Sequence, residues 1–352
     1  MMRRWFALSV SRSFFLIVCL TVFSTAGFGA EMYTVEYLCA DWGPAMTLPS
    51  KAGEKPKFDE SQEEIYFLKQ VGGPNGIRIY LCQMKPDGSE KTEIKELWHN
   101  PNYPIDTQGQ TTWMDVNAKT RKIALSITYA GSDVTGLWTV NLDGTGLRHL
   151  ITPSMVNGYL RTASSPSWTP DGQWIVYCES LRGSTNAARI ARCDSHGSNT
   201  TYLTDGPADG EPRVSPDGTK IAYIVISRTK GGLWLMSADG TSPHVLPNPA
   251  DTRKGWHGGI DPSWSPDGKS IYLSGITCLI LDSQTGGTIL AGQPICMGKR
   301  YTPGCAHWGR LGFVGSTVGG ILVTDAGLHE AKPVGITARH ECDPHGSESC
   351  RW

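Results

Sequence analysis

The sequence contains one seven-residue phrase three times, and this repeat constrains the fold more than any other feature. The copies are PSWTPDG at 166–172, PRVSPDG at 212–218 and PSWSPDG at 262–268. Proline fixes φ at one turn position, aspartate suits the next, and glycine accepts a positive φ. Runs rich in β-branched and aromatic residues follow, such as IAYIVI at 221–226. Each copy therefore predicts a β-hairpin with its turn at Pro-Asp-Gly.

A second hairpin motif follows each copy. LWTVNLDGTGLRHL at 137–150 and LWLMSADGTSPHVL at 233–246 match position by position around Asp-Gly-Thr, and 189–203 is a looser copy. Two hairpins give four antiparallel strands per unit. The apolar start of the second strand recurs at intervals of 40 to 58 residues, at Ile65, Ile123, Ile175, Ile221, Ile271 and Leu311. This spacing predicts an all-β fold, a six-bladed β-propeller of four-stranded antiparallel blades. The first two units and the last are degenerate, so five or seven blades are the alternatives.

The N-terminus has the pattern of a secretory signal peptide. MMRRW supplies the positive end, FFLIVCLTVF at 14–23 is the apolar run, and small residues follow up to Ala30. We expect residues 1–30 to be the signal peptide, 31–60 a lead-in, 61–330 the propeller and 331–352 a C-terminal tail. No later stretch is long and apolar enough to span a membrane. The protein is therefore expected to be exported, to a periplasmic or extracellular location.

The net charge and the cysteine content indicate which partners and which disulfides to expect. The formal net charge is −1, and no basic patch suggests nucleic-acid binding. An exported chain with ten cysteines is expected to form disulfides. The hairpin between Cys178 and Cys193 predicts one bridge across an antiparallel strand pair. Cys342 and Cys350 bracket the tail and predict a second.

The repeated PSWSPDG phrase followed by LWLMSADGTSPHVL resembles the TolB-type propeller repeat, most clearly over residues 160–275. The same repeat occurs in the propellers of prolyl-oligopeptidase-type enzymes and in oligogalacturonate lyases. TolB itself has an α/β domain before its propeller, whereas here the repeats begin soon after the signal peptide. The peptidases add a hydrolase domain, but this sequence has no G-x-S-x-G motif, since GSTVG at 315–319 has threonine in the centre. We therefore predict no catalytic set, no bound metal and no cofactor.

The loops between blades are the expected location of a binding site, because the Pro-Asp-Gly turns on the other face are short. Three loops combine acids, bases and aromatic residues, and they lie at 204–212, 249–262 and 294–308. The predicted ligand-binding residues are Asp209, Glu211, Arg253, Lys254, Trp256, His257, Asp261, Arg300 and Tyr301. Trp113, Trp168, Trp264 and Trp308 recur at one blade position and are predicted to pack between blades. Trp256 breaks that register, so it is the tryptophan expected to face a ligand.

Two classes of function fit these features. The first is an exported, non-enzymatic propeller that binds a protein, peptide or polysaccharide through this loop face. The second is a channel-mouth enzyme such as a metal-assisted polysaccharide lyase, in which Glu211, His257, Asp261 and His307 would converge on an ion. No metal-ligand spacing is recognisable among these residues. The sequence therefore favours binding.

Overall fold

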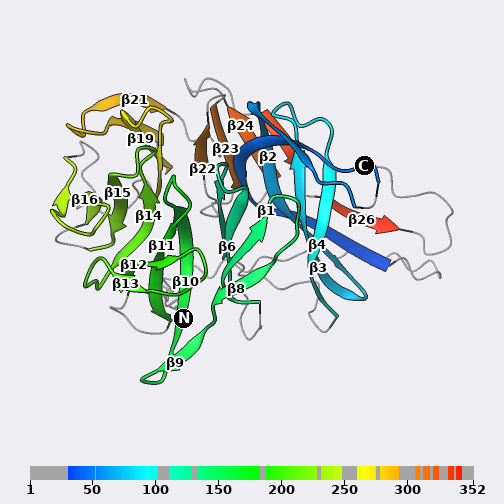
Figure 1. Cartoon of the computed structure of the whole chain (residues 1–352), viewed down its shortest axis with the longest axis horizontal. Coiled ribbons are helices and arrows are strands. Elements are labelled where there is room, and N and C mark those ends of the chain that lie inside the picture. The colour runs from blue at the N-terminus through cyan, green and yellow to red at the C-terminus, as the bar shows by residue number, and fades with distance from the viewer. Residues whose placement is uncertain are drawn as a thin grey trace, which may run out of the picture.

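The computed structural model describes the chain from Glu31 to Cys342 with gaps. The described ranges are 31–51, 53–101, 111–128, 134–182, 188–227, 231–247, 260–274, 278–292, 306–309, 312–317, 320–324, 332–336 and 338–342. All of the regular elements in these ranges are strands, and neighbouring strands pair antiparallel (Figure 1). An all-β propeller of small antiparallel blades is confirmed.

The described strands form six sheets, each with consecutive strands side by side. The first comprises β1 (Glu31–Thr47), β2 (Lys57–Gly73), β3 (Gly76–Met84) and β4 (Thr92–Asn100) with β26 (Ala338–Cys342) on the other side of β1. The second comprises β5 (Thr111–Asn117), β6 (Lys122–Thr128), β7 (Gly136–Asn141) and β8 (Arg148–Ile151). The third comprises β9 (Ser154–Val156), β10 (Tyr159–Trp168), β11 (Trp174–Arg182), β12 (Ala188–Asp194) and β13 (Thr201–Tyr202).

The remaining three sheets have four strands each. The fourth comprises β14 (Asp209–Val214), β15 (Lys220–Val225), β16 (Gly232–Ser237) and β17 (His244–Val245). The fifth comprises β18 (Ile260–Trp264), β19 (Ser270–Ser274), β20 (Cys278–Asp282) and β21 (Thr288–Gly292). The sixth comprises β22 (Ala306–Gly309), β23 (Gly312–Thr317), β24 (Gly320–Thr324) and β25 (Lys332–Ile336). The four-stranded unit predicted from the repeats is thus present, and the first and third sheets each carry a fifth strand.

Both ends of the described chain belong to sheets, which corrects the predicted boundaries. β1 comes from the segment expected to be a lead-in, yet it pairs along its length with β2. β25 and β26 come from the segment expected to be a tail, and β26 pairs with β1 from Glu31↔Cys342 to Val35↔Ala338. None of these three strands carries the Pro-Asp-Gly or Asp-Gly-Thr signal, so the sequence repeats did not reveal them.

The Pro-Asp-Gly turns form as predicted and close the hairpins β10–β11, β14–β15 and β18–β19. The glycines of all three turns have a φ of 71 to 73°. In the second turn Asp217 Oδ1 accepts hydrogen bonds from Ser215 Oγ at 2.6 Å and Thr219 N at 3.0 Å. These bonds to side-chain and backbone donors lower the pKa of Asp217. The turn aspartates are therefore engaged in local structure.

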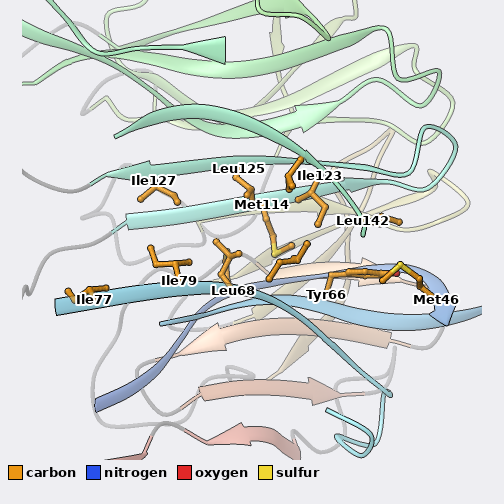
Figure 2. Close-up of a cluster of buried hydrophobic side chains, with 13 residues drawn as sticks. Met46, Tyr66, Leu68, Ile77, Ile79, Met114, Ile123, Leu125, Ile127 and Leu142 are labelled. Atoms are coloured by element: carbon orange, nitrogen blue, oxygen red, sulfur yellow. The ribbon is translucent and has the colours of Figure 1, made fainter. Parts of the chain in front are cut away.

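Buried apolar side chains pack between neighbouring sheets. One cluster joins the first two sheets through Tyr66, Leu68, Met114 and Leu125 (Figure 2). Each of these side chains is fully buried. Leu125→Ala should lower the free energy of unfolding by about 2–5 kcal/mol, because it opens a cavity in a close-packed core. Chemical denaturation of the variant measures this, and exposed Ile289→Ala serves as the control with a change of about 0.5 kcal/mol or less.

Strand register corrects the tryptophan assignment. Trp168 and Trp264 pair with Ile175 and Ile271 and are buried, as expected for inter-blade packing. In the second sheet Ile123 pairs with Val116, which therefore occupies the position of Trp168 and Trp264. Trp113 pairs with Ser126 instead, so the prediction that Trp113 shares this position is wrong. The equivalent residue in the first sheet is Trp42, which pairs with Ile65 and was missed. The side chain of Trp308 lies outside the described part.

The predicted disulfide between Cys178 and Cys193 is wrong. Cys178 lies opposite Ile190, and Cys193 lies opposite Ile175. Because side chains alternate along a strand, this register puts the two thiols on opposite faces of the third sheet. Both are free and buried, and burial raises each thiol pKa to about 12. The predicted partner of Cys342, Cys350, lies outside the described residues.

Candidate functional site

In β1, β5 and β10 the residue that precedes Trp42, Val116 and Trp168, respectively, accepts a hydrogen bond from the next sheet. Asp41 Oδ2 accepts the backbone N–H of Val116 at 2.6 Å, and Asp115 Oδ2 accepts that of Trp168 at 2.6 Å. Ser167 Oγ occupies the same position in β10 and accepts the N–H of Val214 at 3.1 Å. These bonds fix the angle between successive sheets. They also engage carboxylates that would otherwise be available for acid–base chemistry.

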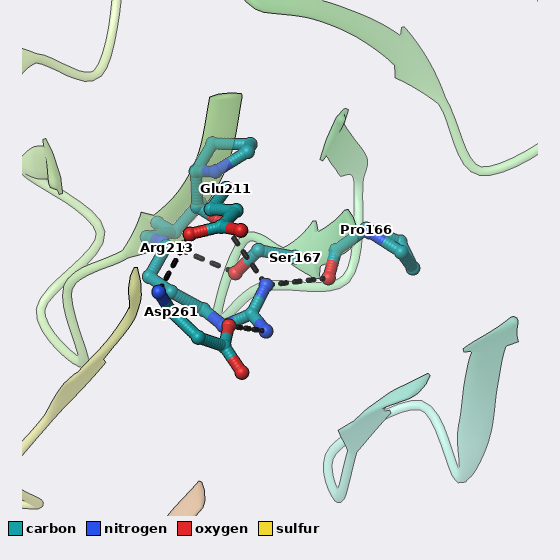
Figure 3. A network of polar contacts seen from close by, with 7 residues as sticks. Pro166, Ser167, Glu211, Arg213 and Asp261 are labelled. Carbon is teal, nitrogen blue, oxygen red and sulfur yellow. Dashed lines mark hydrogen bonds and ion pairs between the residues drawn. The ribbon is translucent and has the colours of Figure 1, made fainter. Parts of the chain in front are cut away.

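In β14 this position is Arg213, which carries donors only. Its Nη2 donates to Asp261 Oδ1 at 2.7 Å, and its Nη1 donates to the carbonyls of Pro166 at 3.3 Å and Pro212 at 3.1 Å (Figure 3). The side chains of Arg213 and Asp261 are only 4% and 3% exposed. Arg213 therefore ties β10, β14 and β18 together through a buried ion pair.

Glu211 completes this network from two residues earlier in β14. Its Oε2 accepts the backbone N–H of Asp261 at 2.6 Å. Burial, reinforced by the nearby Asp261 carboxylate, raises the pKa of Glu211 to about 7, although Arg213 opposes the shift. Glu211 and Asp261 thus lie close together, and the Arg213 guanidinium pairs with Asp261. We name Glu211, Arg213 and Asp261 the acid–arginine cluster.

The backbone at the cluster is strained in a repeated way. Glu211 and Asp261 have φ values of 53° and 63°, and Ser165 at the equivalent place in β10 has 49°. Each residue precedes a proline and lies where the pairing with the second strand shifts register. A non-glycine residue in this region costs on the order of 1–3 kcal/mol. The contacts of Glu211 and Asp261 hold the backbone there.

A cavity of 450 Å³ lies where the innermost strands meet. Its walls include Pro170, Pro216 and Pro266, so the three Pro-Asp-Gly turns lie on one face, as predicted. We call it the axial cavity. It is further lined by Asp41, Trp42, Glu63, Asp115, Val116, Asn117, Ala118, Lys119, Ser167, Trp168, Arg213, Val214, Ser215, Ser263 and Trp264. The cavity lining is about equally polar and apolar and carries both signs of charge, and it is reached from the turn face, opposite the loop face where the sequence placed the site.

The predicted site residues divide into two groups. Glu211 and Asp261 do come together, in the acid–arginine cluster, while Asp209 is 8% exposed and its backbone carbonyl accepts from the Cys178 thiol at 3.6 Å. Burial raises the pKa of Asp209. The other six lie outside the described residues: Arg253, Lys254, Trp256, His257, Arg300 and Tyr301. The side chain of His307 also lies outside the described part.

Sequence reasoning missed Arg213, although a signal was present. PRV replaces PSW at 212–214, so a charged residue stands where two other copies have serine. Comparing the three copies position by position would have singled it out. Asp41 and Asp115 carried no such signal, because their repeats are degenerate.

In the described ranges no three His, Cys, Asp or Glu side chains gather in a way that could hold a metal ion. Among the same residues no helix is long and apolar enough to cross a membrane.

Comparison with known proteins finds relatives that match part of the chain. No family model matches the chain. The Tol-Pal system protein TolB of Francisella tularensis, in several strains, is 36% identical over 119 residues, which are 32% of this chain and 25% of the relative. The match thus spans about a quarter of these curated relatives. The chain has a TolB-like β-propeller fold.

Solved structures match a larger share of the TolB-like chain at lower identity. A puromycin hydrolase S511A mutant is 14% identical with a TM-score of 0.52, over 88% of this chain and 54% of that one. TolB from Acinetobacter baumannii is also 14% identical, with a TM-score of 0.49 over 88% and 65% of the two chains. The hydrolase resemblance concerns the fold alone.

Proposed function

We propose that the protein is an exported TolB-like propeller that binds a protein or peptide partner without chemical turnover. The observation that carries this proposal is that ionisable side chains beside the axial cavity are engaged in contacts between sheets. Asp41 and Asp115 accept backbone N–H groups, and Arg213 pairs with Asp261. These groups hold the sheets together, while the axial cavity beside them offers a chemically mixed recess suited to a peptide.

The curated relatives support a protein partner. These relatives are named as proteins of the Tol-Pal system. Export is supported by the signal-peptide pattern of residues 1–30. N-terminal sequencing of the protein recovered from outside the cytoplasm should start at Glu31. A protein that retains residues 1–30 would contradict export by this route.

The propeller is further proposed to close as a six-bladed ring through β1. β1 contacts β22, β23 and β24 of the sixth sheet and also β5 of the second, and β26 pairs with it. Truncation after 337 removes β26 and should lower the free energy of unfolding by about 2 kcal/mol, because five residues lose their strand partners. Denaturant titration of the truncated and full chains measures this. Truncation after 342 is the control, and equal losses in both would contradict closure by β26.

A peptide library tests the binding proposal. Ala118 lines the axial cavity and is exposed, so Ala118→Trp should fill the entrance without disturbing the core. Random dodecapeptides selected on the wild-type protein should bind Ala118→Trp at least tenfold more weakly. Thr201→Trp, at an exposed position of β13, should bind them normally. Equal binding by all three proteins would refute the axial site.

The loop-face residues remain part of the proposal as a second contact region. If Trp256 anchors the partner, Trp256→Ala should weaken binding by about 2 kcal/mol while leaving thermal stability unchanged. The lyase alternative predicts otherwise. Anionic polysaccharide incubated with the protein and Mn²⁺ or Ca²⁺ would then yield unsaturated ends that absorb in the ultraviolet, and His257→Ala would abolish the signal. We expect no such absorbance.

A further inference from the structure

The β9–β10 hairpin is a surface projection of the third sheet and is separate from the axial cavity. It extends beyond the neighbouring strands of the third sheet (Figure 1). β9 pairs with the start of β10 through Val156↔Tyr159 and Leu160↔Met155. Asn157 and Gly158 form its two-residue turn with φ values of 51° and 81°, the conformation that Asn-Gly favours in tight hairpins. The hairpin is therefore a well-defined projection.

Apolar side chains cover both faces of this projection. Met155 is 67% exposed and Tyr159 is 41% exposed, and their partners Leu160 and Val156 are half-buried. The two residues of a directly opposed pair lie on the same face of a ribbon, and successive pairs alternate. Met155 with Leu160 thus covers one face, and Val156 with Tyr159 covers the other. A flat protein surface covers only one face of a ribbon, whereas a lipid interface surrounds both.

The sequence that flanks the hairpin carries charge of one sign. Between Asp143 and Asp171 the chain contains no acidic residue, but it contains Arg148 and Arg161. Arg161 directly follows the apolar pairs in β10. An apolar tip with an adjacent arginine matches the interface of an anionic bilayer, where the apolar groups enter the headgroup region and the cation meets lipid phosphates.

We propose that the β9–β10 hairpin docks on the surface of an anionic lipid bilayer and tethers the exported propeller there. The tethering is peripheral, and it uses a surface separate from the axial cavity. It places the propeller beside a membrane surface.

Vesicle co-sedimentation tests this proposal. The mature protein should bind vesicles of phosphatidylcholine with 30% phosphatidylglycerol at least fivefold better than pure phosphatidylcholine, and 0.5 M salt should weaken the binding. Met155→Ser combined with Tyr159→Ser should reduce binding to the anionic vesicles at least fivefold. Arg161→Gln should reduce it severalfold. Ile289→Ser is the matched control, since Ile289 is 58% exposed on β21.

Circular dichroism melting of each variant shows whether the fold is intact, and hairpin substitutions that leave melting unchanged make the comparison valid. A variant that unfolds is replaced by Met155→Thr with Tyr159→Thr, which keeps strand propensity. Equal vesicle binding by the wild type and the hairpin variant would overturn the proposal. So would a wild type that ignores the vesicles but is retained on a polyglutamate resin through the hairpin, because its partner would then be an acidic protein.

Discussion

Asp261→Asn should lower the free energy of unfolding by about 3 kcal/mol or more. The substitution removes one charge of a buried pair and leaves the Arg213 guanidinium, 4% exposed, without its carboxylate. Asparagine is the appropriate replacement because it tolerates the positive φ of position 261 better than alanine. Urea denaturation at pH 7 measures the loss.

Two further variants separate charge from packing. Asp217→Asn changes the same residue type in an exposed turn and should cost less than about 1 kcal/mol, because the amide oxygen still accepts the turn hydrogen bonds. Adding Arg213→Met to Asp261→Asn should recover part of the loss, since no buried charge is then left uncompensated. A double variant less stable than the single one would show that the guanidinium contributes mainly through its bonds to the Pro166 and Pro212 carbonyls.

Glu211 should make the protein less stable as the pH rises from about 4.5 to 7. Its pKa in the folded protein is raised to about 7 from a usual 4.5, so the folded state holds a proton that the unfolded chain has released. This stabilising contribution is complete below the unfolded pKa and is lost as the pH passes the folded pKa. The largest possible effect is about 3 kcal/mol at 1.36 kcal/mol for each pH unit.

Glu211→Gln removes the titration but keeps an oxygen that can accept the Asp261 N–H. The variant should match the wild type at pH 5 and melt several degrees higher at pH 8. Glu60→Gln, at an exposed position in β2, should leave both melting temperatures unchanged. Thermal melts at the two pH values measure this. A Glu211→Gln variant that melts lower than the wild type at pH 8 would mean that the ionised carboxylate is the stabilising form.

The repeats predicted the blades because their turns are built from local interactions. Pro-Asp-Gly fixes a hairpin whatever surrounds it, and its glycines adopt the positive φ that the turn requires. Strands β1 and β26 were misassigned because they pair residues about three hundred positions apart, and no local signal records such a partner. The Cys178–Cys193 error has a related cause, since a three-residue difference in register reverses which face a side chain occupies.

The candidate site was predicted in part. Glu211 and Asp261 were both predicted to bind ligand, and a 2.6 Å hydrogen bond from the Asp261 N–H to Glu211 joins them. The carboxylate of Asp261 is engaged in a buried ion pair with Arg213, a contact that sequence spacing did not indicate. Burial of this kind depends on how three sheets pack, which sequence spacing alone does not determine.

The most direct test of partner binding at the axis is in-cell photo-crosslinking. p-Benzoylphenylalanine placed at 118, on the rim of the axial cavity, should give a crosslinked band of discrete mass in the exported protein. The same probe at 201, on the exposed edge strand β13, should give none. Absence of a crosslink at 118, or equal crosslinks at both positions, would contradict a specific protein partner at the axial cavity.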